Sequence, residues 1–158
     1  MEISNKALKY LTGLEGCILK VKPVSGKDHI GVGHLITPAE KLSGKIHGIA
    51  YKTGITQQEC EEILKIDLTR FVKDVNNTIK VKLEQHQFDA LVMFAFNIGD
   101  GAFNSEISAV KSIHMNRFDL VPRGMLKWCK ETINGKLMRS KGIINRRNKE
   151  IKFWLGEI

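Results

Sequence analysis

An acid at the end of an apolar, helix-like segment is the first group in this sequence that could do chemistry. Glu15 is followed by Gly16, and a short polar, glycine-rich stretch then leads to the run Ile30-Gly31-Val32-Gly33-His34. Glycoside hydrolysis needs a carboxylic acid held on a rigid element, with a second polar group across a groove. The order of these residues therefore indicates acid catalysis on a glycosidic bond, provided that other segments agree.

The elements around these residues are predicted from the spacing of apolar side chains. Residues 3–14 have the spacing of one helix face, whereas residues 17–36 alternate and contain turn residues, which is typical of a small β-meander or hairpin. Residues 37–55 look like a loop with a short turn of helix. Thr56 and Glu59 form a capping box that begins a long helix to about residue 77.

The second half of the chain is predicted to be helical. Residues 84–97 are apolar on most sides and indicate a core helix, and shorter helices are expected near 105–115, 118–132 and 141–155. The predicted fold class is α+β and mostly helical.

The composition is that of a soluble globular protein with a strong positive charge. The 158 residues are 42% hydrophobic and 27% charged, and the formal net charge is +8. This balance favours a polyanionic partner: nucleic acid, an anionic lipid surface or bacterial cell wall. No nucleic-acid-binding motif accompanies the basic residues, so we expect no nucleic-acid partner.

The cysteines and the N-terminus suggest an intracellular protein. Cys17, Cys60 and Cys129 are odd in number and widely spaced, so we expect them reduced, without a disulfide framework or metal knuckle. The first residues lack the pattern of a signal peptide, and no apolar run reaches about 18 residues, so no stable membrane insertion is expected.

Taken in order, the motifs resemble the phage-type lysozymes, the muramidase endolysins of tailed phages. The resemblance covers roughly residues 5–155. It is carried by Glu15-Gly16, Leu19-Lys20, Gly26, Ile30–His34, Gln87–Leu91, Phe94–Gly99, Phe103, Trp128, Gly142–Arg147 and Glu150.

The resemblance implies a single lysozyme-like domain, 1–158, with a cleft between two lobes. The N-terminal β-containing lobe would span about 13–56, a long connecting helix about 57–79 and a helical C-terminal lobe about 80–158, with helix 1–12 packed on that lobe. The implied substrate is the peptidoglycan glycan strand, cut between N-acetylmuramic acid and N-acetylglucosamine. No cofactor or metal is implied. The protein would be a monomer in the host bacterial cytoplasm until a holin-like factor gives it access to the cell wall.

The resemblance assigns Glu15 as the general acid, but the usual second carboxylate is missing. The family's Asp position falls at Pro23 or Val24, and its Thr position is His29. Three readings remain open. His29 replaces the missing group as base or nucleophile; Asp28 is the substitute carboxylate; or the site is impaired and the protein binds glycan without efficient turnover.

Further residues are expected to support the site or to bind substrate. By the resemblance, His34 pairs with Asp67 as a structural bridge, and Arg146 or Arg147 anchors the acid's geometry unless both belong to a solvated basic face.

Candidate glycan contacts are Leu35, Phe96 and Asn97. Three further histidines are expected at the surface: His47, His86 and His114. The competing functions are a non-catalytic peptidoglycan-binding relative and a cationic, membrane-active lytic protein acting through residues 141–155.

Overall fold

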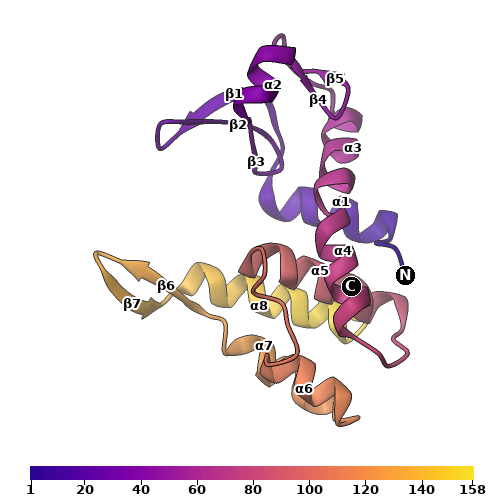
Figure 1. Cartoon of the computed structure of the whole chain (residues 1–158). Coiled ribbons are helices and arrows are strands. Elements are labelled where there is room, and N and C mark those ends of the chain that lie inside the picture. The colour runs from indigo at the N-terminus through magenta and orange to yellow at the C-terminus, as the bar shows by residue number, and fades with distance from the viewer. The chain divides into compact units, whose positions relative to one another are not determined.

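Eight α-helices, one 3-10 helix and three small antiparallel sheets make up the computed structural model, which describes residues 1–158 (Figure 1). The chain divides into two units: an N-terminal unit, Asn5–Thr69, and a C-terminal unit of Met1–Ser4 with Arg70–Ile158. The predicted α+β, mostly helical class is confirmed. The packing of the first helix on the C-terminal lobe stays a prediction.

The N-terminal unit combines three helices with two small sheets. Its elements in chain order are α1 (Asn5–Glu15), β1 (Ile18–Val24), β2 (Lys27–Gly31), β3 (His34–Leu35), α2 (Pro38–Ser43), β4 (Lys45–Ile46), β5 (Ile49–Ala50) and α3 (Gln57–Asp67). Apolar side chains of α1 and α3, among them Leu11 and Ile63, are fully buried. The expected first helix and β-meander are both present, and the short helix expected within residues 37–55 is α2. The β4–β5 hairpin in the same segment was not expected.

The turn between β1 and β2 sets the register of the main sheet, whose order is β1-β2-β3. Ser25 and Gly26 both have positive φ, 51° and 76°. Such a two-residue turn matches the twist of a hairpin. It places Pro23 opposite Asp28 and Lys22 opposite His29.

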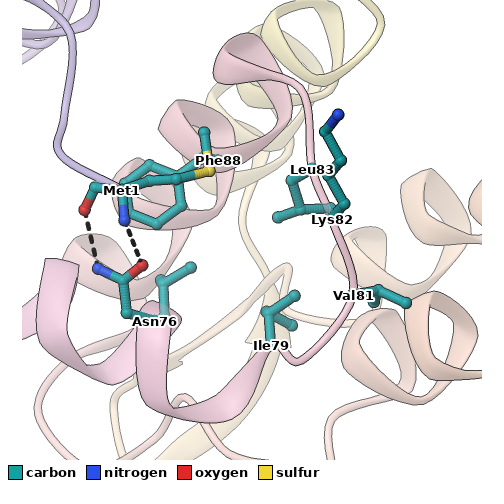
Figure 2. A pocket seen from close by; sticks show the side chains of 8 residues that line it. Met1, Asn76, Ile79, Val81, Lys82, Leu83 and Phe88 are labelled. Atoms are coloured by element: carbon teal, nitrogen blue, oxygen red, sulfur yellow. Dashed lines mark hydrogen bonds between the residues drawn. The ribbon is translucent and has the colours of Figure 1, made fainter.

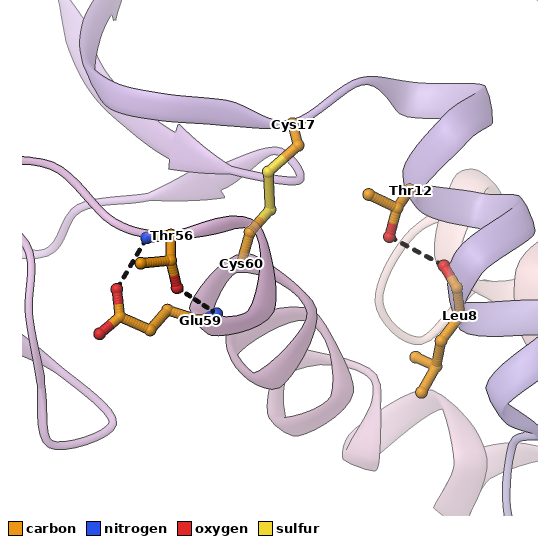
Figure 3. The surroundings of a disulfide bond; sticks show 6 residues. All are labelled: Leu8, Thr12, Cys17, Thr56, Glu59 and Cys60. Atoms are coloured by element: carbon orange, nitrogen blue, oxygen red, sulfur yellow. Dashed lines mark hydrogen bonds between the residues drawn. A yellow bond between two sulfur atoms is a disulfide. The ribbon is translucent and has the colours of Figure 1, made fainter.

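A disulfide joins Cys17, just before β1, to Cys60 in the first turn of α3 (Figure 3). The expectation of reduced cysteines is therefore wrong for these two, whereas Cys129 is a free, buried thiol. Wide spacing in sequence says nothing about proximity in space: the helical packing of α1 on α3 brings residues 43 positions apart together. The bond links the segment after Glu15 to α3.

The C-terminal unit is built around the pairing of α5 with α8 and of α6 with α7. Its elements are α4 (Thr69–Thr78), α5 (Gln85–Ile98), α6 (Ser108–His114), the 3-10 helix η1 (Phe118–Leu120), α7 (Val121–Leu126), β6 (Lys130–Ile133), β7 (Lys136–Arg139) and α8 (Lys141–Trp154). The core helix expected at 84–97 is α5, and the stretch expected as one connecting helix consists of α3 and α4, which meet at Leu68.

The helix expected over 118–132 is wrong in its second half. α7 ends at Leu126, and β6 and β7 form a hairpin whose turn residues, Asn134 and Gly135, have φ of 49° and 76°. Close packing also restricts α7, because a Cβ at Gly124 would lie 2.5 Å from the backbone nitrogen of Ala109 in α6. No helix in the chain is both long enough and apolar enough to span a membrane.

Reduction of the Cys17–Cys60 bond should destabilise the N-terminal unit. The bond closes a loop with a sequence separation of 43. For a loop of this size, the chain-entropy model gives about 4 kcal/mol of stabilisation from restriction of the unfolded chain, and measured values are typically about 2–4 kcal/mol. Denaturant unfolding with and without a phosphine reductant measures the difference.

The double variant Cys17→Ser/Cys60→Ser is the control, because reductant should not change its midpoint. Equal midpoints for the oxidised and reduced wild-type protein would contradict a stabilising role.

Candidate functional site

Glu15 is the last residue of α1 and is exposed. Gly16 ends the helix in the left-handed region, with φ of 78°, and its N–H donates to the carbonyl of Thr12 at 2.9 Å. Glycine adopts this conformation without a Cβ clash, which is why helices often end this way. The acid is thus held between a helix end and the disulfide-linked residue Cys17.

His29 lies on β2, the middle strand of the sheet, and one of its ring nitrogens makes a hydrogen bond to the backbone. Its Nδ1 lies 3.0 Å from the carbonyl oxygen of Lys27. Because a carbonyl only accepts, Nδ1 carries the proton in this contact and Nε2 of the neutral ring keeps its lone pair. His29 is also the cross-strand partner of Leu35 on β3, so these two predicted site residues share one face of the sheet.

Asp28 lies on the other face of β2, which it shares with the buried Ile30. Its Oδ2 is 2.8 Å from Nζ of Lys41 on α2. Asp28 is also directly opposite Pro23, one of the two positions where the family's carboxylate is expected. The register therefore places a carboxylate on the same face as Pro23, but in an ion pair with a lysine.

Two histidines and two carboxylates form a polar cluster in the N-terminal unit. Nδ1 of His34 lies 2.8 Å from Oδ2 of Asp67, the partner expected from the sequence. Nε2 of His34 lies 3.1 Å from both carboxylate oxygens of Glu40, and Nε2 of His47 is 2.8 Å from Oδ1 of Asp67. Sequence reasoning placed His47 at the surface and gave Glu40 no role. The capping box of Thr37 and Glu40 on α2 was the available signal.

Hydrogen bonding in this cluster changes the protonation equilibria of its members. The hydrogen bond to Asp67 raises the pKa of His34, burial opposes this, and Glu40 acts in the same direction as Asp67. Burial works to raise the pKa of Asp67, but the hydrogen bonds from His34 and His47 outweigh it and hold the pKa below its ordinary value. The cluster therefore favours the ion pair of His34 with Asp67.

In the C-terminal unit, the predicted residues Arg146, Arg147 and Asn97 belong to a largely buried network. Glu150 is fully buried and accepts hydrogen bonds from Nε of Arg146 at 2.9 Å and from Arg147. Arg147, also fully buried, donates to Asn97 and to the carbonyl of Trp128. The reading of the two arginines as a solvated basic face is wrong. The buried partner Glu150 was part of the motif but had been given no role.

A groove of about 540 Å³ lies at the end of α5 beside this network. It is lined by Asn97, Ile98, Lys127, Trp128, Lys130, Leu137 and Ile143. Trp128 is 38% exposed there, and two lysines give the groove positive charge. Phe96 packs edge-to-face on Phe71, so this candidate glycan contact is also part of the packing of α4 on α5. The β6–β7 hairpin, which the sequence reasoning missed, supplies one wall.

A second cavity, of about 410 Å³, contains none of the predicted site residues (Figure 2). Apolar side chains of α4, α5 and the segment between them line it, and Met1 covers one side. The Met1 ammonium donates to Oδ1 of Asn76 at 2.7 Å, and Nδ2 of Asn76 donates to the Met1 carbonyl at 2.8 Å. This contact fixes the first residue of the chain to α4.

Comparison with known proteins assigns the family. A family model described as phage lysozyme matches residues 12–150. The chain belongs to the phage lysozyme family, and the class of lysozyme-type glycoside hydrolase expected from the sequence is thereby confirmed.

Relatives and a solved structure agree with this assignment. The endolysin of Bacillus phage PZA is 34% identical over 95% of this chain, which spans 54% of that protein's length. The SAR-endolysin of Pseudomonas phage phiKMV is 34% identical, and the match covers 92% of this chain and 84% of that protein. The structure of an endolysin from Escherichia coli O157:H7 phage FAHEc1 superposes with a TM-score of 0.84 at 32% identity, covering 100% of this chain and 96% of that chain.

The His34–Asp67 pair should make stability depend on pH. Because the pKa of His34 is raised on folding, its contribution is complete below the unfolded value of about 6.5 and is lost as pH rises through the folded pKa. Because the pKa of Asp67 is lowered, the contribution also disappears as pH falls through that value. Asp67→Asn should cost roughly 1.5–3 kcal/mol at about pH 5.5, the usual range for a charged hydrogen bond, and less at about pH 9.

Urea unfolding in metal-free buffer at the two pH values measures this difference. Asp119→Asn is the matched control, because it removes the carboxylate of an exposed pair with Arg117. An Asp67→Asn effect of the same size at both pH values would rule out the ion pair.

Proposed function

We propose that this protein is an endolysin-type muramidase that cuts the β-1,4 bond between N-acetylmuramic acid and N-acetylglucosamine in peptidoglycan. The observation that carries the proposal is the position of Glu15 at the end of α1, with His29 on the middle strand of the same unit, in a chain of the phage lysozyme family. The net charge of +8 suits a substrate that carries carboxylates.

In the proposed reaction, Glu15 donates its proton to the glycosidic oxygen as the bond to the muramic acid carbon breaks. Nε2 of His29 takes a proton from water, and the water oxygen attacks that carbon. The contact of Nδ1 with the Lys27 carbonyl supports this role, because it leaves the lone pair on Nε2. Attack by water from the opposite face inverts the anomeric configuration, whereas direct attack by the imidazole would give a covalent intermediate.

Three residues are assigned to substrate binding. We assign Leu35, which shares a sheet face with His29, to an apolar contact with the sugar. Asn97, held by Arg147 and bordering the groove at Trp128, would bind an acetamido group. Phe96 would contribute apolar surface beside it.

The place of action is also part of the proposal. We propose that the protein acts as a monomer, accumulates in the host cytoplasm and reaches the wall with the help of a holin-like factor. Disulfides persist in oxidising compartments. The Cys17–Cys60 bond therefore suits the state of the protein at the wall, and the thiols would be reduced before release.

The competing function is a glycan-binding relative with impaired turnover. The feature in its favour is the absence of a carboxylate at Pro23 and Val24. Replacement of Glu15 separates the two functions, because only the muramidase loses turnover.

Replacing Glu15 tests general acid catalysis. Glu15→Gln keeps the size of the side chain but removes the transferable proton, so turnover should fall by roughly 100-fold or more. Release of reducing sugars from purified peptidoglycan measures turnover, and cosedimentation with cell wall measures binding, which should persist.

Glu62→Gln, an exposed position on α3, is the control and should match the wild type. Equal release by Glu15→Gln and wild type would contradict the muramidase mechanism. Lysis of cells without sugar release would instead favour a membrane-active protein.

Replacing His29 and Asp28 separately distinguishes the two substitutes for the missing carboxylate. His29→Ala should lose most of the activity, by roughly 100-fold if the imidazole is the base, while Asp28→Asn should stay near wild type because its carboxylate pairs with Lys41.

The first-formed product, observed by NMR, reports the anomeric configuration, and an inverted product supports water attack. His114→Ala controls for the loss of a histidine. If His29→Ala is as active as wild type and Asp28→Asn is inactive, Asp28 is the group that replaces the carboxylate.

A further inference from the structure

The polar cluster of His34, Glu40, His47 and Asp67 contains more acceptors than neutral imidazoles can satisfy. A neutral imidazole has one N–H, and a carboxylate only accepts. Yet His34 faces Asp67 with one ring nitrogen, at 2.8 Å, and Glu40 with the other, at 3.1 Å. Either His34 carries two protons, or another cation takes the place of the proton between Nδ1 and Asp67.

The atoms that face each other in this cluster, imidazole nitrogens and a carboxylate oxygen, are of the types that bind zinc-class ions. Nitrogen atoms of His34 and His47 and a carboxylate oxygen of Asp67 all lie within 4.8 Å of one another. Two imidazoles and one carboxylate, with a water in the fourth position, form a common zinc site. We propose that His34, His47 and Asp67 bind a divalent cation of the zinc class.

Ion binding requires the three ligand atoms, which lie within 4.8 Å of one another, to rearrange around the ion. Zinc binds nitrogen and oxygen at about 2.0–2.2 Å, so tetrahedral ligands lie about 3.3 Å apart. His34 contacts Oδ2 of Asp67 and His47 contacts Oδ1, each at 2.8 Å. An ion between the two imidazoles would therefore be bound by both carboxylate oxygens or, after rotation of the carboxylate, by one of them. His47 is the most exposed of the three side chains, at 30%, and has the most room to rotate, whereas His34 and Asp67 are 10% and 18% exposed.

Glu40 supplies an independent argument for this geometry. In protein zinc sites the ligating histidine usually donates its other N–H to a carboxylate, which fixes the tautomer and orients the ring. Glu40 occupies this position on His34, and Thr37 holds Glu40 in turn, with its N–H donating to Oε2 at 2.8 Å. With its Nε2 proton donated to Glu40, a neutral His34 ring would present the lone pair of Nδ1 to the ion.

The bound ion would connect three separate segments of the N-terminal unit. His34 is on β3, His47 is in the turn between β4 and β5, and Asp67 ends α3. The ion would act as a structural clip that stabilises this unit, independently of the proposed hydrolysis. It is not part of the proposed reaction.

Metal titration of the chelator-treated protein tests the site. Isothermal titration calorimetry with Zn²⁺ should give one site per chain, and Co²⁺ should produce the intense visible bands of a tetrahedral ion. The midpoint of thermal unfolding should rise with Zn²⁺ and stay unchanged with Mg²⁺, which prefers oxygen ligands. Absence of a stoichiometric site in the wild-type protein would overturn the proposal.

Two variants and one control locate the ion. His47→Asn should weaken Zn²⁺ binding at least tenfold, and asparagine tolerates the positive φ of 49° at this position. Glu40→Gln keeps the capping box of α2 and should weaken binding roughly 10–100-fold, the usual effect of removing an outer carboxylate. His114→Asn, on α6 in the other unit, should bind as wild type.

Unchanged Zn²⁺ affinity in His47→Asn would contradict the assignment. If a variant does not fold, the histidine ring signals of the wild-type protein give the answer by NMR. Zn²⁺ should shift the signals of His34 and His47 but not those of His114, and the opposite pattern would overturn the site.

Discussion

A buried carboxylate between two guanidinium groups determines the arrangement of the C-terminal unit. Glu150 and Arg147 are both fully buried, and removing such charges from water costs several kcal/mol per ion unless their hydrogen bonds are satisfied. Arg147 therefore requires partners from several elements: Glu150 on α8, Asn97 on α5 and the Trp128 carbonyl before β6. Its guanidinium also lies 4.9 Å from the centre of the Phe94 ring. This network positions Asn97, which is proposed to bind glycan, and the backbone of Trp128, which borders the same groove, because both supply acceptors to Arg147.

A disulfide and a polar cluster help to hold the short elements of the N-terminal unit together. Its strands β3, β4 and β5 have two residues each, so they bury little apolar surface. The Cys17–Cys60 bond and the cluster around Asp67 join these short elements to α3. The rigidity of this unit matters for function, since a general acid and a base lose effectiveness when their positions drift by about 1 Å.

Local sequence patterns predicted most of the helices and the first sheet. They could not predict contacts between residues that are distant in the sequence. The apolar spacing of α1 and α5 and the capping box of α3 were enough to place these helices. The Asn134-Gly135 pair was an available hairpin signal that the helical reading of 118–132 overlooked. The Cys17–Cys60 bond and the contact of His47 with Asp67 depend on tertiary packing, which leaves no trace in local spacing. The resemblance to the phage lysozymes supplied Glu15, whose role no periodicity could indicate.

Strand register limits how this chain can replace the missing carboxylate. Adjacent residues on a strand point to opposite faces, so Asp28 and His29 cannot serve the same side of the sheet. Asp28 is opposite Pro23 and therefore shares its face, but it also forms an ion pair with Lys41 and has buried Ile30 as its neighbour on that face. His29 shares the other face with Leu35 and keeps a lone pair on Nε2. A residue that takes over a catalytic role must be on the face that substrate reaches, with an available lone pair. The lone pair is the difference that the contacts show: Nε2 of His29 keeps one, whereas the carboxylate of Asp28 pairs with Lys41, which is why His29 is the proposed substitute.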